Sequence, residues 1–133
     1  MRPVLCLVAA LALVGCGSDQ EAAAEAAARS FDMALRTGDV GGACAALAPG
    51  TRAELEASAG RTCPQALPAQ ELGALERVMS VQRYGRQASI EVGTSDGTTD
   101  TWFLSRFGGR WLLVAASCQA RPQLPYDCDL EGP

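Results

Sequence analysis

The sequence predicts an α+β domain in which N-terminal helices pack on one face of a four-stranded antiparallel meander. Apolar side chains recur at helical spacing between residues 18 and 65, beside several residue patterns that cap helices. From Val78 onwards the apolar side chains recur at every second position. Short glycine-containing turns separate these alternating segments and favour hairpins between neighbouring strands. Helices followed by a run of strands are typical of the α+β class.

The first apolar run of the chain ends at a cysteine. Residues 4–14 follow a short positive start at Arg2, and their run is shorter than the ~20 residues of a membrane-spanning helix. This length is typical of a signal-peptide core. The run closes with Leu13-Val14-Gly15-Cys16, which resembles the lipobox of bacterial lipoproteins. The resemblance implies that diacylglycerol joins the Cys16 thiol and that cleavage leaves Cys16 as the first mature residue.

This interpretation divides the chain into a lipoprotein signal peptide (1–15), a lipid-anchored N-terminus (16–18), a folded domain (19–118) and a tail (119–133). An ordinary secretory signal is one alternative, and a buried helix with a chance cysteine is another. The first fits less well because the alanines of the run are followed by more apolar residues instead of a polar mature start. We therefore expect a protein held by lipid on the extracytoplasmic face of the cell membrane.

The composition excludes several kinds of chemistry. The chain has no histidine, and all 11 of its basic residues are arginine. It therefore lacks histidine bases, histidine metal ligands, Schiff-base lysines and the phosphate-loop lysine. Its formal net charge is −4, and removal of Arg2 with the signal would leave the mature domain more acidic. An acidic domain with scattered arginines is a poor nucleic-acid binder, so we expect no nucleic-acid partner.

The first helix is expected from Ser18 to about Thr37. Ser18 and Glu21 have the spacing of a capping box, and Gly38 can supply the left-handed residue that ends the helix. Opposite charges at i,i+4 spacing lie outside its apolar stripe, as Glu25/Arg29 and Asp32/Arg36. The stripe itself consists of Ala24, Ala27, Ala28, Phe31 and Leu35.

Shorter helices are expected next. Asp39 can cap a second helix, which Pro49-Gly50 would end. Thr51-Arg52-Ala53-Glu54 has the spacing of a capping box and predicts a third helix to about Ser58. Thr62-Cys63-Pro64-Gln65 repeats the pattern more weakly, with a proline that the first turn of a helix tolerates.

The four strands follow one another at short intervals. The clearest covers residues 88–92, where Ala88, Ile90 and Val92 alternate with polar side chains. The others are expected from Val78 to the turn at Gly85, at about 101–107, and at about 111–117.

The last of these strands is apolar on both faces, which a half-solvated meander strand should not be. Its two faces would carry Trp111, Leu113 and Ala115, and Leu112, Val114 and Ala116, respectively. If helices cover the first face, the second needs another cover. The tail could lay Leu124 and Tyr126 over it, or a second protein copy or another envelope protein could pack there. Trp102, Trp111, Leu112 and Val114 are therefore the candidate pocket or interface residues.

Four of the six cysteines remain once Cys6 leaves with the signal and Cys16 carries lipid. Four cysteines allow three connectivities. The expected bonds are Cys44–Cys63 within the helical half and Cys118–Cys128 between the last strand and the tail, because crossed pairings would bridge the helices to the sheet end twice. A metal site is the rival interpretation, but the chain has neither a Cys-x-x-Cys motif nor a histidine. We expect no metal and no cofactor.

The order of elements resembles NTF2-like (cystatin-like cone) domains, and more closely the small actinobacterial lipoproteins of that type. The shared segments are Cys44-Ala45-Ala46-Leu47-Ala48-Pro49, the Cys63 segment, Phe103-Leu104-Ser105-Arg106, Gly108-Gly109-Arg110-Trp111 ending in Cys118, and Pro125-Tyr126-Asp127-Cys128. These motifs are structural. The resemblance therefore implies an NTF2-like fold. Because such domains often hold a pocket between the helices and the sheet, it also implies a pocket there.

Two classes of function follow, beside a third possibility, a passive envelope component with no specific ligand. The first is a binding or accessory module for a protein partner or a small apolar ligand. The protein partner could be a second copy of the chain, which would make a homodimer. The second is a ketosteroid isomerase- or dehydratase-like enzyme that uses a carboxylate in the pocket, and its candidate residues are Asp32, Glu91, Asp100 and Asp127. We expect a binding protein, because solvated surface carboxylates are the simpler interpretation of these acids.

Overall fold

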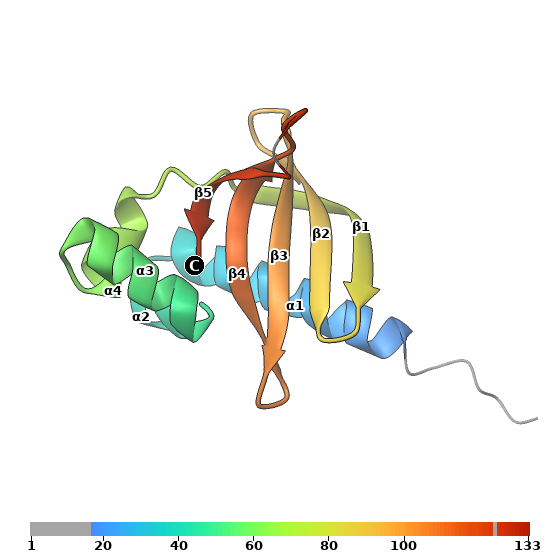
Figure 1. The fold of residues 1–133 in the computed structure, drawn as a ribbon, viewed down its shortest axis with the longest axis horizontal. Helices are drawn as coiled ribbons and strands as arrows, with labels where there is room; N and C mark the ends of the chain where they lie inside the picture. The colour runs from blue at the N-terminus through green and yellow to red at the C-terminus, as the bar shows by residue number, and fades with distance from the viewer. Residues whose placement is uncertain (1–16, 124) are drawn as a thin grey trace, which may run out of the picture.

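The computed structural model describes residues 17–123 and 125–133, and its helices precede a single antiparallel sheet (Figure 1). The sheet has five strands in the order β1-β2-β3-β4-β5. α1 crosses the back of this sheet, and α2, α3 and α4 lie together beside its β4–β5 end. The elements are α1 (Ser18–Arg36), α2 (Val40–Ala45), α3 (Pro49–Ala59), α4 (Cys63–Ala66), the short 3-10 helix η1 (Leu67–Ala69), β1 (Leu75–Tyr84), β2 (Gln87–Thr94), β3 (Thr99–Phe107), β4 (Arg110–Gln119) and β5 (Asp127–Glu131).

The main core lies between α1 and the sheet. Ala24 and Ala28 are fully buried, and their small side chains let the helix approach the strands closely. One turn further along, the Phe31 ring meets the Trp102 ring edge to face, with 5.8 Å between centroids. The buried residues of the core cluster run from Ala24 to Leu130, so the tail contributes to the core as well.

The predicted ion pairs and glycine stop of α1 are confirmed, but the predicted capping box is not, because Gly17 is the N-cap and no side chain of the described residues caps the helix. Glu25 and Arg29 form an ion pair, as do Asp32 and Arg36, with N–O distances of 2.8 and 3.2 Å. The second pair also binds the chain that enters β1, because Asp32 Oδ1 accepts from the Leu75 amide at 3.1 Å. α1 begins at Ser18 itself, and Gly38 follows its last turn with a φ of 80°.

The boundary between α2 and α3 differs from the prediction. Asp39 caps α2 as expected, accepting from the Gly42 amide at 3.0 Å, but α2 ends at Ala45 and Pro49 is the first residue of α3. Proline fits this position because its missing N–H has no partner in a helix's first turn. Thr51 therefore does not cap α3. Its hydroxyl instead donates to the Val114 carbonyl at 2.8 Å, which joins α3 to β4.

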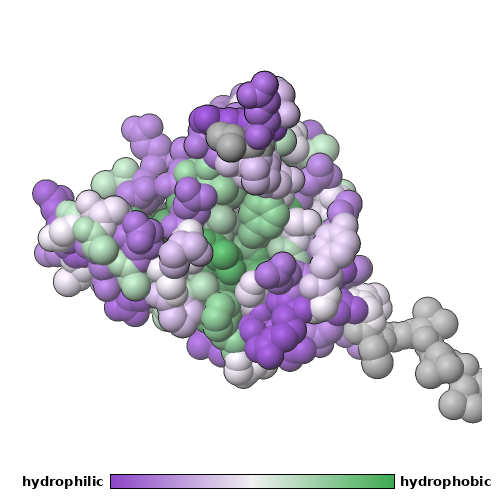
Figure 2. All heavy atoms as spheres, in the orientation of Figure 1, coloured by the Kyte–Doolittle hydropathy of each residue, from purple (hydrophilic) through white to green (hydrophobic). Residues whose placement is uncertain are grey.

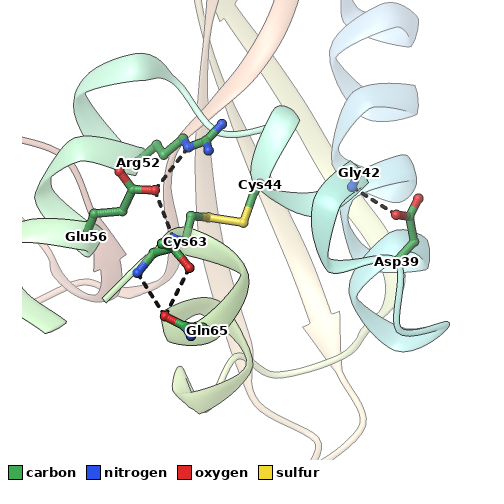
Figure 3. Close-up of a disulfide and its surroundings, with 8 residues drawn as sticks. Asp39, Gly42, Cys44, Arg52, Glu56, Cys63 and Gln65 are labelled. Carbon is green, nitrogen blue, oxygen red and sulfur yellow. Dashed lines mark hydrogen bonds and ion pairs between the residues drawn. A yellow bond between two sulfur atoms is a disulfide. The ribbon is translucent and has the colours of Figure 1, made fainter. Parts of the chain in front are cut away.

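The predicted disulfide Cys44–Cys63 is present and joins α2 to α4 (Figure 3). The carboxylate of Glu56, on α3, accepts from the Cys63 amide at 2.9 Å and from Arg52 Nε at 3.4 Å. The bond from the Cys63 amide is the main reason that the pKa of Glu56 lies below its ordinary value. Cys63 on α4 is thus linked both to α2, through the disulfide, and to α3, through Glu56.

The sheet has one strand more than the sequence predicts. Residues 127–131 form β5, which pairs with β4 so that Cys118 lies opposite Cys128 and Ala116 opposite Leu130. The second predicted disulfide, Cys118–Cys128, joins these two strands. The tail therefore extends the sheet beside β4, and the Leu130 side chain is only 3% exposed.

β4 does not alternate regularly, which corrects its predicted faces. Leu104 pairs with Leu113 and Phe103 pairs with Ala115, so Val114 is an extra residue in β4. A second irregularity follows before Cys118, where Ser117 has a φ of 53°. Such bulges shift every later side chain to the other face. As a result, Ala116 joins Trp111 and Leu113 in the core cluster, and Ala115 does not.

Candidate functional site

An apolar hollow lies on the outer face of the sheet, which we define as the face opposite α1. Figure 2 shows it as a depression between the short helices and the C-terminal segment, with polar side chains along its lower right border. The volume of the hollow is about 390 Å³. Its lining residues come from all five strands and from the segments on either side of β5: Tyr84, Gln87, Ala88, Ser89, Phe103, Leu104, Ser105, Val114, Ala115, Pro125, Tyr126, Cys128, Glu131 and Gly132.

One row of paired residues forms the floor of the hollow. Ser89 on β2 lies opposite Phe103 on β3, and Phe103 lies opposite Ala115 on β4. Glu131 on β5 is the partner of Ala115 and continues the row. Opposed residues of an antiparallel sheet point to the same face, so the register places these four side chains side by side.

Tyr126 forms the wall that the tail provides. Its ring meets the Phe103 ring edge to face, with 4.8 Å between centroids and 74° between planes. Tyr126 remains 39% exposed, so its contact with Phe103 leaves part of the ring free. Two residues later, Cys128 is bonded to Cys118 on β4 and fixes the position of this wall.

The bulge at Val114 shapes the side of the hollow opposite the Tyr126 wall. The Val114 carbonyl accepts from the Thr51 hydroxyl at 2.8 Å and from the Gly132 amide at 3.1 Å. α3, β4 and the C-terminal residues therefore meet at one oxygen atom. Gly132 suits this contact because a Cβ there would lie 2.8 Å from Thr51 Oγ1 and 3.2 Å from the Thr51 amide nitrogen.

Besides the exposed side chains of Gln87 and Glu131, the hollow offers few polar groups. Within the described residues, the hydroxyls of Ser89 and Ser105 have no hydrogen-bond partner, and both residues are half-buried. The Tyr84 hydroxyl at the rim donates to Gln82 at 2.8 Å. An apolar hollow with two free hydroxyls is suited to a small, mostly apolar molecule that carries one or two polar atoms.

The structure separates the four candidate pocket or interface residues of the sequence analysis. Trp102 is fully buried against α1, and Trp111 belongs to the same core with its Nε1 atom donating to Gln20 Oε1 at 3.3 Å. Val114 lines the outer hollow. Leu112 is 8% exposed, and its backbone pairs with that of Ser105, a residue of the hollow.

Sequence reasoning did not assign Ser89, Phe103 and Ser105 to a site. Each belongs to a strand whose alternation is visible in the sequence, but alternation does not say which strands are neighbours or in which register. The aromatic residues Phe103 and Tyr126 were the only available signal. They lie far apart in the sequence and meet through the tail strand that the sequence did not predict.

Three of the four candidate catalytic carboxylates have other roles. Asp32 binds Arg36 and the Leu75 amide, as described above. Glu91 is exposed on β2 and accepts from the Ser80 hydroxyl at 2.6 Å. Asp127 is exposed and paired with Arg121. None of the three lines the hollow.

Asp100 is the exception, because it is only 5% exposed. It lies on β3 two residues before Trp102 and therefore points to the helix side of the sheet, away from the hollow. Burial raises the pKa of Asp100, although a hydrogen bond from Gln119 Nε2 at 3.5 Å acts in the opposite direction. The nearby Asp96 raises it further, since hydrogen bonds from Thr94 and Thr98 lower the pKa of Asp96 to about 2 and keep it charged.

Asp100→Asn should therefore raise the melting temperature at pH 7 by a few degrees. A buried acid with a raised pKa penalises folding above that pKa, and the penalty disappears as the pH falls through it. Melting curves between pH 7 and pH 3.5 should show the two proteins converging at low pH. The exposed Glu71→Gln is the control, with little expected change. A variant that is less stable than the parent at pH 7 would contradict the destabilising charge.

Among residues 17–123 and 125–133, no group of three or more cysteine and acidic side chains is arranged to hold a metal ion. In the same part of the chain, no helix is both long and apolar enough to cross a bilayer.

Comparisons of the chain with protein-family models, with curated proteins and with solved structures found no match. The structure itself defines an α+β domain, with helices followed by an antiparallel sheet.

Proposed function

We propose that this protein is a lipid-anchored extracytoplasmic binding protein, held in the membrane through Cys16, that takes a small, mostly apolar ligand in the outer hollow. The hollow is the single observation that carries the binding function. Its volume of about 390 Å³ falls within the range of small-molecule sites. The anchor is supported by the apolar run and the lipobox-like residues before Cys16, which lie outside the described residues.

A small ligand fits the shape of this face better than a second protein does. The outer face is concave, with the tail and the short helices rising beside it (Figure 2). A flat sheet face would suit a partner, whereas a depression walled by Tyr126 suits a molecule that enters it. The tail covers only part of the face, so it leaves the Phe103 row accessible.

Binding is also favoured over isomerase or dehydratase chemistry. An enzyme of that kind needs a carboxylate against the bound substrate. Here the buried acid, Asp100, points to one face of the sheet, and the hollow lies on the other. The acid that does line the hollow, Glu131, is exposed to solvent and not set among apolar walls. We further propose an NTF2-like domain on the basis of the element order, with the site on the outer face and not between the helices and the sheet.

The fluorescent dye 8-anilinonaphthalene-1-sulfonate can test the hollow, since it brightens on binding apolar surface. The parent protein should bind it saturably at one site. Ser105→Trp should fill the hollow and weaken binding about ten-fold or more, equivalent to about 1.4 kcal/mol. Thr99→Trp is the matched control, because Thr99 is an exposed residue of the same strand outside the hollow. Fluorescence titration and calorimetry give the affinities.

Equal dye binding by the parent and the Ser105→Trp variant would place the apolar site elsewhere and contradict the proposal. Light scattering on the same samples tests the protein-partner alternative. A parent dimer that Ser105→Trp converts to monomer would mean that a second copy occupies the hollow. A monomeric parent with dye binding lost only in Ser105→Trp supports the small-ligand site.

A further inference from the structure

Two hairpin turns project from the same end of the sheet (Figure 1). One joins β1 to β2 after Tyr84, and the other joins β3 to β4 after Phe107. They are directly connected at Arg86 and Arg106. The Arg106 amide donates to the Arg86 carbonyl at 2.9 Å, and Arg86 Nη2 donates to the Arg106 carbonyl at 2.8 Å. The two turns therefore form one continuous surface, which we call the hairpin end.

The first turn of α1 lies toward this end as well. Gln20 accepts a hydrogen bond from Trp111, which is the second residue of β4 after the β3–β4 turn. Only Gly17 separates Cys16 from Ser18, where α1 begins. Two residues span at most about 7 Å. A lipid on Cys16 would therefore hold the hairpin end close to the bilayer surface.

The hairpin end carries four arginines: Arg83, Arg86, Arg106 and Arg110. Within the described residues none of them forms an ion pair, whereas the four arginines that do form one are Arg29, Arg36, Arg52 and Arg121. The guanidinium groups of Arg83 and Arg106 contact turn carbonyls, those of Gly85 and Gly109, at 3.0 and 3.3 Å.

The only acids of the first turn of α1 are Asp19 and Glu21, so arginines outnumber carboxylates at this end of an acidic protein. Arg86 and Arg106 also line a polar depression between the two turns, together with Gly108 and Gly109. A depression between two guanidinium groups without a carboxylate partner complements a phosphate group.

Two exposed aromatic side chains accompany the arginines. Tyr84 is 67% exposed at the end of β1, and Phe107 is 41% exposed at the end of β3. An aromatic ring beside cationic groups is the composition that favours the interface between lipid head groups and acyl chains. Neither arginines alone nor exposed aromatic side chains alone would indicate a lipid-binding surface, but here both occur on adjacent turns.

From this arrangement we infer that the hairpin end is a second membrane contact, in which its arginines bind the phosphates of anionic phospholipids and Tyr84 and Phe107 enter the head-group layer. The inference rests on the proposed lipid anchor at Cys16. It implies a fixed orientation of the domain, in which both turns face the bilayer and the α3–α4 region does not contact it.

Arginine labelling tests this orientation in the full mature protein. The protein is purified from a bacterial host, and mass spectrometry of the N-terminal peptide first establishes whether Cys16 is acylated. It is then reconstituted in phosphatidylcholine vesicles with or without phosphatidylglycerol and treated with phenylglyoxal. Labelling of Arg86 and Arg110 should be about five-fold slower in the anionic vesicles, and high salt should remove the difference. Arg61, exposed between α3 and α4, should react equally in both.

A matched pair of variants makes the test specific. Arg86→Gln should reduce the protection of Arg110, whereas Arg61→Gln, which removes the same charge elsewhere, should leave it unchanged. Equal labelling of Arg86 in both vesicle types, with Cys16 acylated, would overturn the inference and leave the anchor intact. An unmodified Cys16 would overturn the anchor and the inference that depends on it.

Discussion

Replacing Cys16 by serine should move the protein from the membrane fraction to the soluble fraction and abolish incorporation of labelled fatty acid. The lipobox resemblance makes the Cys16 thiol the acceptor of diacylglycerol, and a serine hydroxyl does not replace it. Acyl chains contribute about 0.8 kcal/mol for each buried CH₂ group, so a diacyl anchor holds a small domain firmly and its loss is a large effect. Fractionation and labelled-palmitate incorporation measure both outcomes.

Cys6→Ser is the control for this prediction. Cys6 lies inside the apolar run, and by the same interpretation it is removed with residues 1–15. This variant should remain in the membrane fraction and keep its label. Continued labelling of the Cys16→Ser protein would show that another residue carries the lipid, and unchanged membrane association without label would show that the anchor is not a lipid on this residue.

Local patterns predicted the helices well, apart from the cap expected at Ser18 and the boundary at Pro49. A capping aspartate and i,i+4 ion pairs involve residues close in sequence, so the sequence alone predicts them at Asp39 and along α1. Pro49 is ambiguous because proline both ends helices and begins them. The contact that distinguishes these roles in the structure, from the Thr51 hydroxyl to the Val114 carbonyl, joins residues far apart in the sequence.

The strand pattern failed where β4 meets its neighbours. Its predicted faces assume strict alternation, and the bulges at Val114 and before Cys118 break it without a glycine or proline to mark them. The carbonyl of Val114 instead receives bonds from α3 and the C-terminal residues. The hollow depends on this same register, so its position could not follow from the sequence.

No strand is predicted in the tail (119–133), because it contains Pro122 and Pro125 and its residues show no period along its whole length. Charged residues at every second position, as in Asp127, Asp129 and Glu131, are typical of an edge strand that resists further pairing. The predicted disulfide placed the tail beside β4. Once Cys128 is held opposite Cys118, the free edge of β4 supplies backbone partners for the residues that follow.

Leu130→Ala should therefore destabilise the protein by about 3 kcal/mol, even though it changes a residue close to the end of the chain. The Leu130 side chain is 3% exposed and belongs to the core cluster, opposite Ala116 of β4. The Cys118–Cys128 bond remains in the variant and keeps the tail beside β4, so the measured loss reports the packing of this one side chain. Met33→Ala is the control, because Met33 is 65% exposed on α1 and alanine favours helices. Urea unfolding without reductant gives both free energies. If Leu130→Ala were as stable as Met33→Ala, Leu130 would lie outside the core and β5 would be only a tethered segment at the edge of a four-stranded sheet.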